Sequence, residues 1–373
     1  MDNGTGTQEQ LHIAKDHVAP LISQFSMVQN ELARLFDFPG ISAQSTQSAI
    51  TWWQSQNAEQ QYTYRGALAA LASPLIIADI GINFENRSLV NTHAIIPSMQ
   101  LTDPLYLFAE EDGGVKYKME RIFNGEFFIN TLLLYLQGGA PIYEMEMKFE
   151  IPVRDFAVLL GIVDLRQRLE FRALLDHDVF RSTMKSDEIV AAVADGIAAP
   201  DPRWLLAFSL PMLHVPADKF SSESISQSVD SLIRIGLLQR AGETVSLTVA
   251  GERFAESAGR RLNSIRIDVY GAGIDGSNGR QSQLFIRGDS FLWYAAVFGQ
   301  NGGSVVVAVV NIEKAEALLK ETFSPAAVPK PVVMPASSSA AKGQKYCTRC
   351  GAPLPSSARF CRKCGNHVSN EAT

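Results

Sequence analysis

The chain has 373 residues, of which 46% are hydrophobic and 19% charged, and its formal net charge is −6. This is a globular composition with room for two domains and a tail. No apolar run reaches the roughly 18–20 residues that span a bilayer, and the N-terminus lacks a basic segment followed by an apolar one. We therefore expect a cytoplasmic protein without a membrane span or a secretory signal.

The charge is unevenly distributed along the chain. Residues 341–373 hold six basic residues and one acidic residue, a formal charge of +5, which leaves −11 on residues 1–340. An acidic body repels nucleic acid and anionic membranes on average, whereas a basic tail attracts them. Nucleic-acid binding by the body is therefore disfavoured.

The first half of the chain predicts helices, four strands and a closing helix. Residues 46–74 predict a helix, a polar turn, a short strand through Tyr62 and Tyr64, and a helix of small residues. We interpret Trp52 and Trp53 as core residues, with a partner surface as the alternative. Short polar connections then predict an antiparallel meander, covered on one face by the helix "EFFINTLLLYLQGG". The predicted strands are residues 75–82, 89–97, 104–111 and 114–122.

The second half repeats this order. It opens with the helical segment "DFAVLLGIVDLRQRLEFRALL", and residues 221–261 predict a helix, a turn at Gly242, an alternating strand through Val249 and a new helix from about Gly251. Four strands and the helix "NIEKAEALLKETF" follow. The predicted strands are residues 264–271, 283–288, 290–298 and 304–310.

Two copies of one module are the economical interpretation. We predict an α+β fold in which residues 1–150 form the first α+β module and residues 151–322 the second, each ending in a four-stranded meander and a helix. Residues 323–345 contain four prolines and then a Ser/Ala/Gly run, which predicts a flexible linker. Residues 346–367 form a separate small domain.

The order helix, small hairpin, helix in "GLLQRAGETVSLTVAGERF" resembles a winged-helix segment. Winged helices that bind DNA need donor side chains on the outer face of one helix and a basic wing. The corresponding positions here carry mixed charge: Glu223, Gln227, Asp230, Arg234, Arg240 and Glu243. This charge favours a protein-contacting or structural role, and DNA binding is the alternative.

The layout of the body resembles the cytosolic substrate chaperones of type VII secretion systems. The segments "ALAALASPLIIADIGI" and "AGERFAESAGRRLNSIRIDV" carry this resemblance, because in each a helix of small residues leads directly into a strand. The resemblance implies that the protein binds a helical client through exposed sheet or loop surface of the second module.

Several motifs suggest chemistry without the context that it requires. "GAGIDG", Gly271–Gly276, matches a dinucleotide-binding pattern, but a strand follows it instead of a helix, so we interpret it as a hairpin loop. "DHD", Asp176–Asp178, lacks converging partners, and we interpret His93 and His214 as core or surface histidines. The body has no cysteine nucleophile, G-x-S-x-G elbow or phosphate loop. We therefore expect no enzymatic activity.

The C-terminal segment holds every cysteine of the chain, in two Cys-x-x-Cys pairs. Each pair lies in the hexapeptide aromatic, Cys, x, x, Cys, Gly, in which a tight turn can direct two sulfurs at one ion. Four thiolates favour zinc, and four filled positions leave no vacancy for a reacting water. We predict one structural Zn²⁺ held by Cys347, Cys350, Cys361 and Cys364.

This segment resembles the short zinc-ribbon tails of many unrelated prokaryotic proteins. The resemblance implies metal binding and leaves the role open. We interpret the ribbon as a zinc-stabilised knob that contacts protein, with nucleic-acid contact and a redox switch as alternatives. The residues that would contact nucleic acid are Arg349, Arg359, Arg362 and Lys363.

The sequence thus favours a non-enzymatic intracellular adaptor or chaperone-like protein that binds a protein partner and carries a structural zinc ribbon. The rival hypothesis is a DNA-associated regulator that uses the winged helix and the basic ribbon together. A third hypothesis is an enzyme whose site is assembled from scattered residues. The sequence does not predict an oligomeric state.

Overall fold

The computed structural model forms two compact units, Met1–Pro329 and Lys330–Thr373. The residues that the structure describes are 11–36, 38–84, 88–98, 100–111, 114–138, 141–272, 278–298, 303–323, 345–346 and 353–354.

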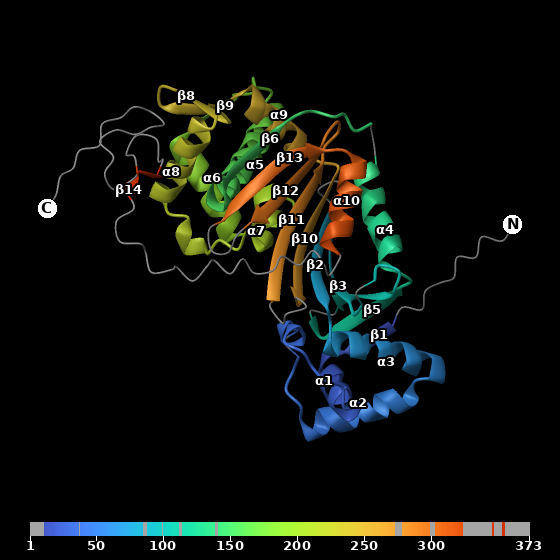
Figure 1. Ribbon diagram of the computed structural model, residues 1–373. Helices are drawn as coiled ribbons and strands as arrows, with labels where there is room; N and C mark the ends of the chain where they lie inside the picture. The colour runs from blue at the N-terminus through green and yellow to red at the C-terminus, as the bar shows by residue number, and fades with distance from the viewer. Residues whose placement is uncertain are drawn as a thin grey trace. The chain divides into compact units, whose positions relative to one another are not determined.

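The first unit is built on one ten-stranded antiparallel sheet of described residues, in the order β1-β5-β4-β3-β2-β10-β11-β12-β13-β6 (Figure 1). The first half of the chain contributes β1 (Leu11–Ala14), β2 (Ile76–Phe84), β3 (Ser88–Ile96), β4 (Leu105–Glu111) and β5 (Lys116–Ile122). The second half contributes β6 (Lys148–Pro152), β10 (Asn263–Ala272), β11 (Asn278–Arg287), β12 (Leu292–Phe298) and β13 (Ser304–Val310).

Both predicted meanders are present, as β2 to β5 and β10 to β13, and their closing helices are α4 (Gly125–Gln137) and α10 (Ile312–Thr322). The predicted α+β class is confirmed. The edge strands β1 and β6 were not predicted. They have four and five residues and run directly into helices, so no turn signal separates them from the next element.

The central strands β2 and β10 join the two halves of the sheet. They pair over nine residues, from Ile76 opposite Gly271 to Phe84 opposite Asn263. On one face of this seam Ile80, Ile82, Ile265 and Ile267 are buried in one core with residues of α4 and α10. The predicted module boundary at residues 150 and 151 falls inside β6.

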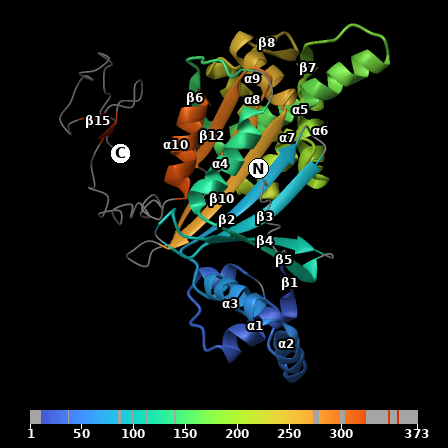
Figure 2. The ribbon, with the colours of Figure 1, turned by 90° about the vertical axis from the view of Figure 1, so that its right-hand side faces the viewer.

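Each face of the sheet is covered by helices (Figures 1 and 2). α4 and α10 lie on one face, and the other face carries a small N-terminal helical layer and a larger one from the second half. The N-terminal layer comprises α1 (Lys15–Gln24), η1 (Leu32–Leu35), α2 (Ala43–Ser55) and α3 (Ala58–Ala72). The larger layer comprises α5 (Val153–Leu175), α6 (Ser186–Ala198), α7 (Leu205–Leu213), η3 (Ala217–Lys219), α8 (Ser222–Arg234) and α9 (Val249–Gly259).

The predicted strand through Tyr62 and Tyr64 is wrong, because both residues lie in α3. Asn57 caps this helix by accepting a hydrogen bond from the backbone N–H of Gln60 (2.9 Å). Tyr64, Leu68 and Leu71 then form a buried stripe at helical spacing. Two alternating tyrosines are too short a pattern to outweigh a cap and such a stripe, so the winged order predicted for residues 46–74 is absent from these residues.

In the second half, a three-stranded sheet packs with the helices. It consists of β7 (Thr183–Lys185), β8 (Leu238–Ala241) and β9 (Thr244–Leu247), in the order β7-β9-β8. The predicted turn at Gly242 connects β8 to β9, with φ at +63°. The predicted extension of β9 to Val249 is wrong, because the Thr248 hydroxyl caps α9 by accepting from the N–H of Gly251.

The described residues of the second unit are two short antiparallel strands, β14 (Lys345–Tyr346) and β15 (Pro353–Leu354). They flank Cys347 and Cys350 in the sequence. All four cysteines, and all but the first and last residues of the predicted linker, lie outside the described residues. Within the part of the chain that is described, no helix is long and apolar enough to cross a membrane.

Candidate interaction surfaces

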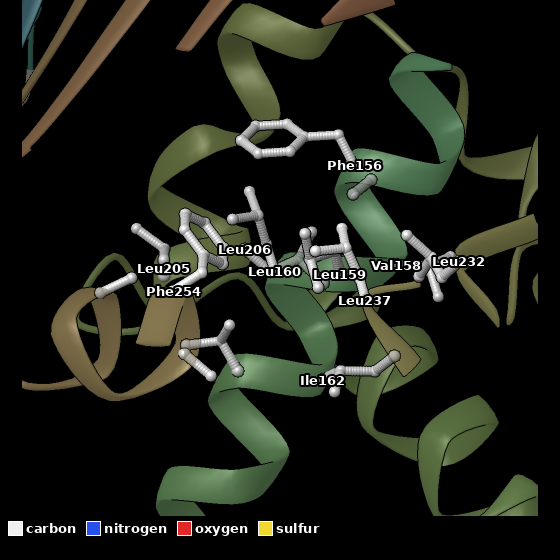
Figure 3. Packing of buried hydrophobic residues seen from close by; sticks show 14 of the residues in the cluster. Phe156, Val158, Leu159, Leu160, Ile162, Leu205, Leu206, Leu232, Leu237 and Phe254 are labelled. Atoms are coloured by element: carbon white, nitrogen blue, oxygen red, sulfur yellow. The ribbon is translucent and has the colours of Figure 1, made fainter. Parts of the chain in front are cut away.

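Helix α5 is buried at its beginning and exposed at its end. It has 23 residues, about 34 Å at ~1.5 Å per residue. Its buried residues all lie between Val153 and Leu165, where Phe156, Leu159 and Leu160 pack into the core shown in Figure 3. No residue after Leu165 in this helix is buried.

The middle of α5 is held by polar contacts with α9. Arg166 donates to Glu252 (2.8 Å) and lies 3.2 Å from Glu170, which in turn accepts from Arg260 (2.7 Å). The side chain of Gln167 also donates to the carbonyl of Gly259 (2.8 Å). These contacts end at Glu170, so the last turn of α5 lies beyond its support on α9.

The end of α5 presents large apolar side chains to solvent. Phe171, Leu174 and Leu175 share one side of the helix at i, i+3 and i+4, and are 51%, 67% and 80% exposed. Val179, in the returning chain, is 86% exposed. Figure 2 shows this part of α5 extending away from the neighbouring helices, with the chain passing back to β7. We call Phe171, Leu174, Leu175 and Val179 the α5 tip.

The outer face of α8 carries mixed charge, as the sequence predicted. Its buried side, which includes Ile225, Val229 and Leu232, packs into the core, while Glu223, Gln227 and Asp230 are exposed. Arg240 of β8 donates a hydrogen bond to Asp230 of α8 (2.6 Å), so the positive charge of this arginine is neutralised by an aspartate. This surface offers little positive charge to a phosphate backbone.

A polar cluster that the sequence did not reveal lies where the two halves of the sheet meet. Asp268 of β10 is buried and lies opposite Asp79 of β2. It accepts hydrogen bonds from the guanidinium of Arg280 (2.7 Å) and from the hydroxyl of Ser282. His214, which follows α7, places Nε2 3.0 Å from Asp268. Antiparallel register places Asp79, Asp268, Arg280 and Ser282 on neighbouring strands, and His214 reaches Asp268 from the end of α7. The cluster is therefore not visible as a local motif in the sequence.

The charges in this cluster perturb one another. Burial raises the pKa of Asp268, against the opposing effect of its hydrogen bonds with Ser282 and Arg280. Burial, together with the positive charges of Arg280 and Arg266, lowers the pKa of His214 to about 4. The imidazole is therefore neutral near pH 7 and donates its Nε2–H to the carboxylate. His214 thus has a hydrogen-bond partner within the fold, in agreement with its interpretation as a core or surface histidine.

A second buried carboxylate caps a helix. Asp164 of α5 accepts hydrogen bonds from the backbone N–H groups of Leu205 (2.8 Å) and Leu206 (2.9 Å), which open α7. Burial raises the pKa of Asp164 to about 6, although those N–H groups and the nearby guanidinium of Arg261 oppose the shift. This arrangement fixes α7 to α5 and has a structural function.

The remaining candidate residues lie in the core, in the sheet or at the surface of the first unit. Trp52 and Trp53 pack on the N-terminal helical layer, 4.8 Å from the ring of Tyr64 and 4.7 Å from that of Phe25 respectively. Gly271 lies in β10, which pairs antiparallel with β11, and the rest of the segment Gly271–Gly276 after Ala272 lies outside the described residues. Asp176–Asp178 are exposed at the end of α5.

The chemistry of the tail fits a zinc ion. β14 and β15 pair with each other and lie, in the sequence, on either side of Cys347 and Cys350, and two Cys-x-x-Cys pairs are a donor set typical of structural zinc. Among the described residues, which do not include the cysteines, no group of three or more His, Cys, Asp or Glu side chains is placed to hold a metal ion.

Comparison with known proteins gives one family match. The zinc-ribbon domain matches residues 346–368, which confirms the predicted ribbon and supports zinc binding. The assignment of the four cysteines as ligands stays a prediction. No curated protein matches the chain.

Among solved structures, the chain is similar to one in the structure of the Mycobacterium tuberculosis type VII secretion system chaperone EspG5 in complex with the PE25-PPE41 dimer. The sequence identity is 6% and the TM-score is 0.39, over 84% of this chain and 95% of that chain. This level of similarity supports no inference about function.

Proposed function

We propose that this protein is a non-enzymatic adaptor, chaperone-like in holding a protein partner, that carries a structural zinc ribbon. The α5 tip is the observation that supports this proposal best. Soluble proteins rarely expose a contiguous group of large apolar side chains unless the group meets a partner. The partner would cover Phe171, Leu174 and Leu175, each at least half exposed in the first unit.

The proposal includes a winged-helix-like unit over residues 183–259. The element order β7, α6, α7, η3, α8, β8, β9, α9 and the strand order β7-β9-β8 support it. The mixed charge of α8 and the Arg240–Asp230 pair favour a protein-contacting or structural role for this unit. Binding of duplex DNA, with help from the basic ribbon, is the alternative function.

In the ribbon, Cys347, Cys350, Cys361 and Cys364 would hold one Zn²⁺. Four thiolate ligands leave no coordination position for substrate or water, so the metal would supply folding free energy to a segment too short to bury a core. The ribbon would then serve as a contact module, and no chemical step is assigned to it.

Affinity capture from the source organism tests the adaptor function. We compare the full chain with the double variant Leu174→Ser/Leu175→Ser and with the control Val28→Ser/Tyr62→Ser, which removes two apolar side chains that are 83% and 78% exposed elsewhere. At least one protein should be captured by the wild type and the control and be depleted at least tenfold by the tip variant. Equal capture by all three chains would show that the tip is not the partner surface.

A gel shift with duplex DNA distinguishes the DNA-associated regulator from the adaptor. A duplex binder should bind DNA at 50 mM salt and lose affinity by orders of magnitude at 200 mM, because each phosphate contact releases counterions. We expect no shift at either salt concentration. A shift with this steep salt dependence would favour the DNA-associated regulator.

A further inference from the structure

A groove lies on the sheet face that α4 and α10 only partly cover. It has a volume of about 590 Å³ and is lined by residues of β13, of α10 and of the segment that leads into β6. Figure 1 shows α10 beside β13. The floor is apolar, formed by Val306, Ala308 and Val310 of β13 with Tyr294 of β12, and Leu318 of α10 lines one wall.

The side chains of the groove floor are more exposed to solvent than the other side chains on this face of the sheet. Val306 and Ala308 are half-buried, whereas Ile267, Phe285 and Ala296 of the inner strands are fully buried under α4 and α10. Strands lie ~4.8 Å apart, so the outermost pair, β13 and β6, leaves a strip about 10 Å wide. That width matches the diameter of one α-helix with its side chains, about 10–12 Å.

The outer rim of the groove is acidic. Glu144 and Glu146 line it, and Glu150 of β6 lies on the same face, opposite Val306. All three are exposed, and none of the ion pairs found among the described residues involves them. Glu144 accepts only a neutral donor there, the side-chain amide of Asn311 (2.7 Å). Two lysines also line the groove, Lys148 on β6 between these carboxylates and Lys314 on α10, so three carboxylates against two lysines leave one net negative charge, and the carboxylates lie on the outer rim.

We infer that this groove binds an amphipathic helix of a partner protein. The apolar stripe of the helix covers Val306, Ala308 and Leu318, and Lys or Arg residues along one flank face the carboxylates of Glu144, Glu146 and Glu150. Charge complementarity selects a basic helix, because an acidic one would bring like charges together at this rim. The bound helix continues the layer formed by α4 and α10. The groove shares no residue with the α5 tip, so the two surfaces can be tested separately.

Binding of two synthetic peptides tests this inference. Both are 18-residue amphipathic helices with a leucine stripe, one with lysines along the flank and one with glutamates in their place. Fluorescence anisotropy with the full chain should show binding of the lysine peptide and at least tenfold weaker binding of the glutamate peptide. Circular dichroism should show that the lysine peptide gains helix on binding; binding without this gain would overturn the assignment of a helical partner.

Three variants locate the site. Ala308→Arg places a long cation on the floor, and Glu144→Gln/Glu146→Gln removes two charges from the exposed rim without touching the core. Each should weaken binding of the lysine peptide at least fivefold. The matched control Glu59→Gln/Glu243→Gln removes two charges at exposed positions elsewhere and should bind as the wild type does. An equal loss in the control, or no loss in either groove variant, would show general attraction to an acidic protein and overturn the inference.

Discussion

At the scale of single residues, two buried carboxylates of this protein are partnered by groups from other segments of the chain. Asp164 binds the N-terminus of α7 some forty residues on, and Asp268 is bound by His214 and Arg280. A buried polar group without a partner costs about 1–3 kcal/mol. Such contacts therefore specify how the helices and the sheet fit together, and they leave a measurable dependence of stability on pH.

Asp164 predicts one such dependence. Its pKa rises from 3.8 to about 6 on folding, so the folded chain binds the proton more tightly than the unfolded chain. The favourable contribution is complete below about pH 4 and is lost as the pH rises through about 6. Over that range the wild type should lose about 2–3 kcal/mol of unfolding free energy relative to Asp164→Asn, as chemical denaturation at each pH would measure.

The comparison with Asp164→Asn removes the effect of His214. The pKa of His214 falls from 6.5 to about 4 on folding. This imidazole therefore contributes to stability above about pH 6.5, and the contribution is lost as the pH falls through about 4. The two groups thus act in opposite directions over one window, but His214 is present in both chains and cancels. A difference between the two chains that stays constant from pH 4 to pH 7 would contradict the account of Asp164.

At the scale of elements, the same helix or strand serves different purposes along its length. The first half of α5 is core, and its end is the α5 tip. Among the strands, β2 and β10 are the innermost of the sheet and carry the junction between its halves. Since both contribute to one core under α4 and α10, neither half can lose this junction without exposing apolar residues of the other.

This junction predicts that the two halves unfold together. Trp52 and Trp53 report on the first half, and Trp204 and Trp293 on the second. In Trp52→Phe/Trp53→Phe and in Trp204→Phe/Trp293→Phe, the denaturation transition followed by fluorescence should coincide with that followed by circular dichroism of the same variant. Ile267→Ala should shift both by about 2–4 kcal/mol, since it opens a cavity in the shared core. Two separate transitions, or a shift seen by one pair only, would show that the halves are independent.

At the scale of the whole molecule, an acidic body and a basic cysteine-containing tail have separate sources of stability. The described part of the body has three extended hydrophobic clusters, whereas the tail has few apolar residues and would depend on the proposed zinc ion. The two compact units divide at residues 329 and 330. Removing the metal should therefore affect the second unit alone.

Metal analysis checks this expectation. The purified full chain should contain one zinc per chain, and Cys361→Ser should contain much less, because three thiolates hold the ion less well than four. Chelation should leave the unfolding free energy of the body unchanged within about 0.5 kcal/mol, because the four cysteines belong to the second compact unit. A chain without bound metal would remove the basis for a structural ribbon.

The sequence by itself determined the features that depend on local pattern. Alternation and polar turns predicted all eight strands of the two meanders, and helix-like runs predicted α4, α5 and α10. Helical spacing predicted α8, and cysteine spacing predicted the ribbon that the family match confirms. Where a pattern was only two residues long, at Tyr62 and Tyr64, the prediction failed, because a helix cap and a buried stripe of α3 determined the structure.

Tertiary structure alone decided what depends on residues that meet from distant segments. The pairing of β2 with β10, the cluster around Asp268, the exposed end of α5 and the groove beside α10 all arise from register and from which faces the helices leave uncovered. The physical reason is that hydrophobic periodicity tells which side of an element is buried, but the element against which it is buried is set by packing of the whole fold.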